Sequence, residues 1–202
     1  MMHGEFPMAV DGNQNRVSRR ELARTLLAGL AAGVLPAAIS PLHPIHNHLL
    51  DGILLDSADK ALAGASYQPT FLSTAQLASV DRLSDAIIPG SHQAQSAQFI
   101  DLLLSVDAAE HQENFVASLS EMDGAATKAF HRGIAELNMD ELRQLLEAAS
   151  AKDSADYQHF ENLKNWFTGA YYSSEIGMRE LGWTPDRVFP VYPGCTHSAG
   201  HS

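Results

Sequence analysis

Histidine, carboxylate and cysteine side chains stand close together at several points of the 202-residue sequence. His43, His46 and His48 could bind a metal ion if a fixed backbone directed their ring nitrogens at one centre. Prolines flank this run, and nothing in the local pattern fixes the backbone. We therefore interpret the three histidines as part of a polar linker, and we predict no metal site.

Two aspartates are spaced as neighbours on one helical face. Asp81 and Asp85 stand at positions i and i+4, where two carboxylates could share a proton or a metal ion. Leu77, Val80 and Leu83 already define the buried side of the same helix. We therefore expect the two acids to face solvent.

The remaining reactive side chains are isolated. His111, His131 and His159 stand singly on predicted helices, where surface or capping roles are more common than catalysis. Cys195 and His197 are close in sequence, but adjacency alone does not provide the geometry that activates a thiol. The single cysteine excludes a Cys-x-x-Cys-His haem site. Dinucleotide, P-loop and nucleophile-elbow motifs are also absent, so we predict no catalytic residue and no cofactor bound by this chain.

Helical periodicity describes most of residues 73–175. Ser73 and Gln76 fit a capping box, as do Asn138 and Glu141, and Pro89-Gly90 ends the first apolar run. Further helices are predicted from Phe99, Leu102, Leu103 and Val106, from Phe115, Leu119 and Met122, from Leu142, Leu145 and Leu146, and from Tyr157 to about Tyr172. No alternating β-branched run suits a sheet. The predicted fold class is all-α, a compact irregular helical bundle with a nonhelical C-terminal arm.

The N-terminal region has the pattern of an export signal. Ser18, Arg19, Arg20 and Leu22 precede an uncharged segment of 16 residues, Thr25–Ser40. At about 1.5 Å per residue this segment is shorter than the hydrocarbon core of about 30 Å. The paired arginines before a moderately apolar run indicate a twin-arginine signal. An amphipathic or buried helix is the alternative, and no cleavage site is clear, so retention as an anchor stays open.

The predicted organisation has three parts. Residues 1–40 form the signal or anchor, residues 41–70 a linker, and residues 71–202 a helical domain with a C-terminal docking arm. The net charge is −11, with 13 basic and 24 acidic residues. Such an acidic chain does not suit nucleic acid, because phosphate binding requires clustered Lys and Arg.

An aromatic and glycine-containing stretch follows the last long predicted helix. Tyrosine, tryptophan and arginine dominate binding energy at protein interfaces, so their clustering favours docking against a partner. The same side chains could instead close a core. The predicted interface residues are Tyr171, Tyr172, Ser174, Glu175, Ile176, Gly177, Leu181, Gly182, Trp183 and Tyr192.

Five short motifs, in this order and spacing, carry a family resemblance. They are DAIIP (85–89), FIDLLL (99–104), YYSSEIG (171–177), ELGW (180–183) and YPGC (192–195). Over about residues 70–195 the sequence resembles the gluconate 2-dehydrogenase subunit 3 family. Trp183 departs from the pattern, since a tyrosine is expected there.

The resemblance implies a noncatalytic small subunit that accompanies a large flavin-dependent sugar or sugar-acid dehydrogenase of the glucose-methanol-choline type. FAD would be bound by that partner, and haem c by a multihaem cytochrome c acceptor. A flavin enzyme folds around its cofactor in the cytoplasm and the twin-arginine translocase moves folded cargo, so one signal can export both subunits. We expect a periplasmic complex, associated with the cytoplasmic membrane through the complex or through an uncleaved N-terminal segment.

Three alternatives remain open at this point. In an oxidising periplasm Cys195 is either a free thiol or one half of an intersubunit disulfide, and we favour the disulfide. The chain could also be an independent periplasmic enzyme. It could instead be a membrane-tethered binding module with an unrelated partner.

Overall fold

The two predicted capping boxes begin two helices of the structure. Ser73 precedes α4 (Thr74–Ile87), where its hydroxyl accepts a hydrogen bond from the Gln76 amide while the Gln76 side chain accepts one from the Ser73 amide. Asn138 and Glu141 make the same reciprocal pair before α7 (Met139–Ser150). Each box satisfies amides that the first helical turn leaves without partners.

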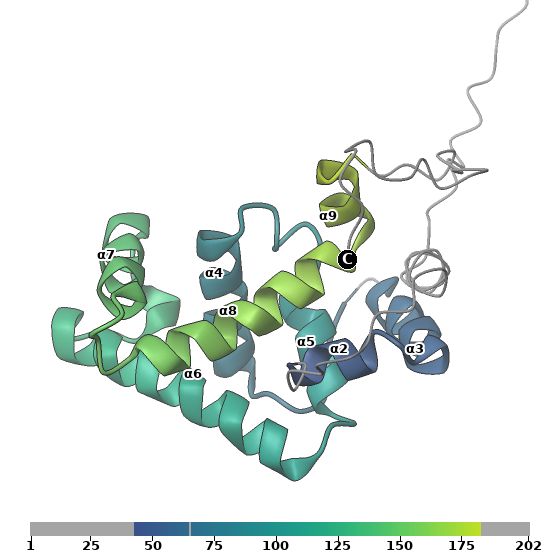
Figure 1. The fold of residues 1–202 in the computed structure, drawn as a ribbon, viewed down its shortest axis with the longest axis horizontal. Helices are drawn as coiled ribbons and strands as arrows, with labels where there is room; N and C mark the ends of the chain where they lie inside the picture. Colours follow the sequence, from purple (N-terminus) through teal and green to yellow (C-terminus); the bar gives the residue numbers. More distant parts are fainter. Residues whose placement is uncertain (1–42, 65, 183–202) are drawn as a thin grey trace, which may run out of the picture.

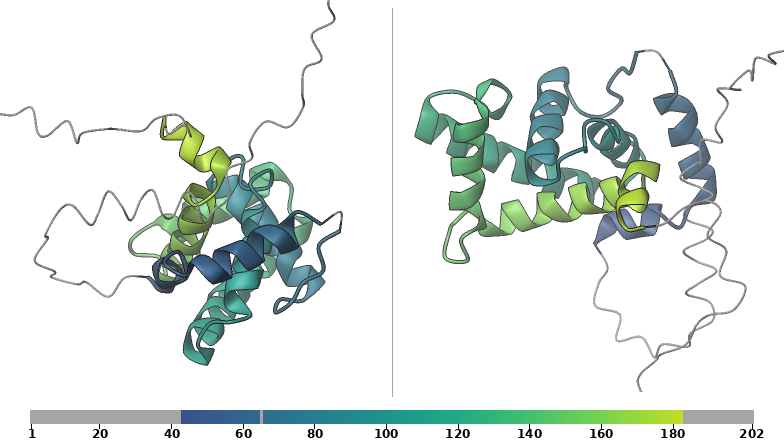
Figure 2. Two further views of the ribbon diagram at one scale, coloured as in Figure 1. Left: turned by 90° about the vertical axis from the view of Figure 1, so that its right-hand side faces the viewer. Right: turned by 90° about the horizontal axis from the view of Figure 1, so that it is seen from above.

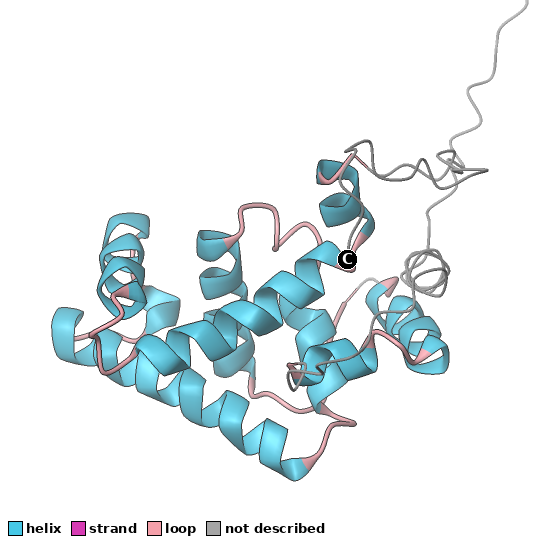
Figure 3. Ribbon diagram, viewed as in Figure 1, coloured by secondary structure: helices cyan, strands magenta, loops and turns pink. Residues whose placement is uncertain are grey.

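The computed structural model describes residues 43–64 and 66–182, and every regular element in these ranges is helical (Figures 1 and 3). The chain order is α2 (Pro44–His48), α3 (Gly52–Leu62), α4, α5 (Ser96–Leu104), α6 (Ala109–Phe130), the 3-10 helix η1 (Ile134–Glu136), α7, α8 (Tyr157–Tyr172) and α9 (Glu175–Glu180). The prediction of an all-α bundle is confirmed.

Helix α8 is the centre of the packing. It crosses the bundle diagonally beside α6, and α2, α4, α5, α7 and α9 also contact it (Figures 1 and 2). Its buried side chains include Trp166 and Phe167, which join Phe99 of α5 and Phe115 of α6 in one continuous core. The Phe115 and Trp166 rings meet edge to face, with centroids 5.7 Å apart.

The segment expected to be a linker, residues 41–70, contains two helices that belong to this core. Ile45 of α2 and Leu55 of α3 are fully or almost fully buried. The Asp51 side chain caps α3 by accepting hydrogen bonds from the Ile53 and Leu54 amides. The linker interpretation failed because α2 has only five residues and is rich in histidine, so its contribution to the core comes from long-range packing.

The C-terminal arm and the end of α5 also differ from expectation. Ser174 caps the six-residue helix α9, which extends three residues beyond Gly177, where the nonhelical arm was predicted to begin. Helix α5 ends at Leu104, so Val106 lies in the following turn and is 59 % exposed rather than on the buried helical face.

The predicted export residues Ser18, Arg19, Arg20 and Leu22 lie outside the described residues, as do Trp183, Tyr192 and Cys195. Among the helices that are described, none combines the length and the apolar character needed to cross a bilayer.

Candidate functional site

The two acids of α4 bind the turn that follows their own helix. The Asp81 carboxylate lies 2.8 Å from the His92 Nδ1 atom, and Asp85 accepts hydrogen bonds from the Gly90 and His92 amides at 3.0 and 3.1 Å. Asp81 is only 26 % exposed at its side chain. The pair therefore fixes a turn, and in the described part of the chain no cluster of three or more ligating side chains suits a metal ion.

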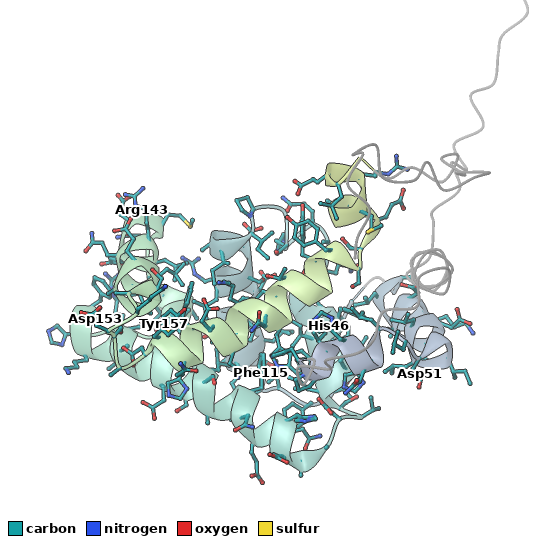
Figure 4. The ribbon with its side chains drawn as sticks, viewed as in Figure 1. His46, Asp51, Phe115, Arg143, Asp153 and Tyr157 are labelled. Carbon is teal, nitrogen blue, oxygen red and sulfur yellow. The ribbon has the colours of Figure 1, made fainter. Side chains whose placement is uncertain are left out.

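The histidines of the N-terminal segment divide between the core and the surface. His43 lies edge to face against Trp166, with ring centroids 5.2 Å apart, and its Nε2 atom is 3.1 Å from Asn162 Oδ1. Burial lowers the pKa of His43 below 6.5, because the charged imidazolium loses its hydration. His46 is exposed on the other side of α2 (Figure 4).

A buried carboxylate joins two histidines that are far apart in sequence. Asp107 Oδ1 lies 2.8 Å from His111 Nδ1, and Asp107 Oδ2 lies 3.1 Å from His48 Nε2. Burial acts to raise the pKa of Asp107, but the bonds from His111, His48 and the Ala108 amide outweigh it, so the pKa lies below its ordinary value. This cluster ties α2 to the turn between α5 and α6.

A second buried carboxylate, missed by the sequence reasoning, holds the segment before α4. Asp101 of α5 has no exposed surface. It accepts hydrogen bonds from the Tyr67 hydroxyl at 2.5 Å and from the Thr70, Phe71 and Leu72 amides at 2.6, 3.0 and 2.6 Å. Burial and this bond to Asp101 raise the pKa of Tyr67. The sequence does contain one signal of this buried carboxylate, because Asp101 is a single acid within an apolar helical run.

The predicted interface residues separate into a buried and an exposed group. Tyr171 is fully buried and packs edge to face on the half-buried Tyr172, with centroids 5.1 Å apart. Burial, followed by the nearby Glu180 carboxylate, raises the pKa of Tyr171 to about 12. Ser174 is also buried, and its hydroxyl donates to the Tyr171 carbonyl at 2.6 Å.

Glycine is required at position 177 within the same region. A Cβ atom there would lie 2.4 Å from the Tyr171 carbonyl oxygen, so a side chain would collide with backbone. By contrast Ile176 and Leu181 are 39 % and 65 % exposed, Gly182 is exposed, and Glu175 pairs with Arg179 at 2.6 Å. Among the described residues of the predicted interface, Ile176 of α9 and its C-cap residue Leu181 therefore supply the exposed apolar side chains that could meet a partner.

Two hollows lie on the described surface. The first, of about 400 Å³, runs between α4, α7 and α8 and is lined by Ala86, Ile87, Met139, Asp140, Arg143, Leu146, Glu147, Ser150 and Phe160. The second, of about 530 Å³, lies between α2, α6 and α8 and is lined by His43, Pro44, Asn47, Glu110, His111, Asn114 and Asn165. Arg143 and Asp51 mark opposite ends of the molecule (Figure 4).

Comparison with known proteins gives one family. The family model described as Gluconate 2-dehydrogenase subunit 3 matches residues 74–189, more than half of the chain, and so includes α4 to α9. Searches of curated proteins and of solved structures found no significant match. Helices α2 and α3 precede the matched range.

Proposed function

We propose that this chain, which belongs to the gluconate 2-dehydrogenase subunit 3 family, is a noncatalytic small subunit that stabilises and escorts a flavin-dependent dehydrogenase. Family membership makes it a subunit of a gluconate 2-dehydrogenase-type complex, with a dehydrogenase subunit as its partner. That match is the observation on which the proposal rests.

In this proposal the chemistry belongs to the large subunit. It is an enzyme of the glucose-methanol-choline type that binds FAD and oxidises a sugar, a sugar acid or a glycoside, and a multihaem cytochrome c accepts the electrons through haem c. The buried acids Asp101 and Asp107 support a structural role for this chain, because their carboxylates are engaged by tyrosine, histidine and backbone donors.

The surface of α9 is one proposed contact with the dehydrogenase. Ile176 and Leu181 present exposed apolar side chains there, and the buried Tyr171 and Ser174 hold α9 against the end of α8. Apolar side chains on a rigid support are typical of interface centres.

Co-purification of the partner tests the proposal directly. The full chain, tagged and expressed in its native host, should recover a larger yellow protein whose flavin spectrum bleaches on addition of sugar substrate. Recovery of the chain alone with substrate turnover would favour an independent periplasmic enzyme. Recovery with an unrelated, flavin-free protein would favour a membrane-tethered binding module.

Export to the periplasm by the twin-arginine translocase is the second half of the proposal. Ser18, Arg19, Arg20 and Leu22 before the apolar segment support it. Substitution of Arg19→Lys together with Arg20→Lys should leave dehydrogenase activity in the cytoplasmic fraction. Arg16→Lys, outside the pair, is the matched control and should export normally. Normal export of the large subunit with the double variant would contradict the escort role.

A disulfide from Cys195 to the large subunit is proposed because the chain has no second cysteine for an internal bridge. Nonreducing electrophoresis of the complex should show one heavier band that separates on reduction. Cys195→Ser should remove that band, while separate bands from the unreduced wild-type complex would exclude the bridge.

A further inference from the structure

Among the described residues, three strongly exposed apolar side chains lie at one end of the molecule. Leu50, in the turn between α2 and α3, is 58 % exposed, and Ile53, in the first turn of α3, is 81 % exposed. Val106, in the turn between α5 and α6, is 59 % exposed. We call these three residues the Leu50 patch.

Contacts beneath the Leu50 patch bring its members together. His48 Nε2 lies 3.1 Å from Asp107 Oδ2, and these residues stand two positions before Leu50 and directly after Val106. Helix α3 also packs against α5. Each turn is fixed by a backbone hydrogen bond, from the Leu50 amide to Asn47 and from the Val106 amide to Leu103. The patch is therefore displayed on an ordered support.

The charge around the Leu50 patch is mostly negative. Residues 43–64 and 105–114, which carry the patch, contain six acidic side chains, of which Asp107 is buried against His48 and His111, and one lysine but no arginine. Asp51 lies between the two apolar residues of the first segment, and Glu110 is exposed on the first turn of α6. Such a border repels an anionic lipid surface and complements a protein surface on which lysine or arginine surrounds apolar side chains.

We propose that the Leu50 patch is a docking surface for the dehydrogenase subunit, which would meet it with apolar side chains bordered by basic residues. An apolar centre with a charged rim is the ordinary composition of a protein interface. The proposal rests on the proposed function for the identity of the partner. It adds a contact from Leu50 and Ile53, which precede the range matched by the family model, and from Val106 within that range.

The test measures flavin recovered per small subunit, with the tagged full chain expressed beside its partner. Ile53→Glu and Val106→Glu, placed on different elements, should each reduce recovery at least tenfold. Met139→Glu is the matched control, because Met139 is 63 % exposed on α7, at the other end of the molecule, and this variant should retain wild-type recovery. Far-UV circular dichroism and the melting temperature of each purified variant verify that it is folded, and Ile53→Ser replaces Ile53→Glu if the latter does not fold.

The charged border provides a second measurement. Glu110→Lys should weaken recovery several-fold, and raising the salt concentration should diminish the difference between Glu110→Lys and wild type. Equal recovery from Glu110→Lys and wild type at low salt would exclude a basic partner surface.

Three outcomes would overturn the proposal, and they are distinguishable. If both patch variants recover as much flavin as wild type and Met139→Glu recovers less, the partner docks at the hollow between α4, α7 and α8 instead. Binding of wild type but not Ile53→Glu to phosphatidylglycerol vesicles, with flavin recovery unchanged, would assign the patch to a membrane. Absence of a flavoprotein from the wild-type purification would refute the proposed function itself.

Discussion

Asp101→Asn should be among the most destabilising single changes in this protein. The carboxylate is fully buried, and each of its oxygens accepts two hydrogen bonds. Oδ1 receives the Phe71 and Leu72 amides, and Oδ2 receives the Thr70 amide and the Tyr67 hydroxyl. An asparagine can place its carbonyl toward one pair only. The less costly choice turns its NH2 group toward Tyr67 and Thr70, because the Tyr67 hydroxyl can rotate to accept from it, but the Thr70 amide then loses its acceptor.

The magnitude follows from that lost acceptor and from the lost charge. A buried amide left without a partner costs about 1–3 kcal/mol, and each of the two bonds from the Phe71 and Leu72 amides weakens by about 1 kcal/mol when its acceptor becomes neutral, so the total is about 3–5 kcal/mol. This is a large part of the 5–15 kcal/mol or so that stabilises a typical domain. Tyr67→Phe removes one donor and leaves the carboxylate with three, so it should cost less than Asp101→Asn. Asp140→Asn is the matched control, since Asp140 is 76 % exposed at its side chain and pairs with Arg143 at the surface.

Urea unfolding at neutral pH, followed by far-UV circular dichroism, provides the free energies. The midpoint should fall for Asp101→Asn while the slope with urea stays that of wild type, because the surface exposed on unfolding is unchanged. A loss below about 1 kcal/mol for Asp101→Asn would refute the reasoning, since it is less than one unpaired buried donor costs. Equal losses in Asp101→Asn and Asp140→Asn would refute it as well.

Three further predictions concern the docking of α2 and α3. Gly169→Ala should cost about 1–3 kcal/mol in urea unfolding, because its Cβ would lie 2.7 Å from the buried Ile45 side chain; Gly124→Ala, with open space around its Cβ, should gain up to about 1 kcal/mol. Because the pKa of His43 is lowered in the folded chain, the unfolded chain takes up a proton at a higher pH than the folded chain does. The free energy of unfolding should therefore fall as pH drops below 6.5. His43→Gln should reduce that pH dependence and His46→Gln should not, as measured by melting temperature between pH 5 and 8. Deletion of residues 1–64 should lower the urea midpoint strongly, because it removes the buried Ile45 and Leu55 side chains from the core.

Local signals predicted the parts of the fold that depend on neighbours in sequence. The capping boxes at Ser73 and Asn138 act within three residues, and the structure confirms both. Helix α8 ends at Tyr172, as its apolar spacing predicts. Ile45 gave no comparable signal, because its burial depends on the absence of a side chain at Gly169, which is 124 positions away.

Residue type alone could not separate docking from core packing at the C-terminal end. A tyrosine supplies the same large apolar surface to a partner as to an interior, so Tyr171 fitted either role. Its burial here depends on contact with α9 and with the turn at Gly90, where an added Cβ atom would lie 3.1 Å from the Tyr171 hydroxyl. The interface assignment stays a prediction for the exposed residues. The polar clusters at Asp101 and Asp107 were missed because all their partners except His111 are distant in sequence or belong to the backbone.

The position of α2 limits where an export signal could be removed. The uncharged segment predicted to be a signal ends at Ser40, and the first described residue, His43, packs its ring on Trp166. Cleavage at or before residue 43 keeps the His43 ring on Trp166 and Ile45 in the notch formed at Gly169, whereas cleavage after Ile45 removes a fully buried side chain from the core. The segment predicted as a signal therefore ends three residues before the first described residue. Because the twin-arginine route accepts folded proteins, a signal joined so closely to a packed helix is compatible with export of the assembled domain, and the mature N-terminus should lie at or before residue 43.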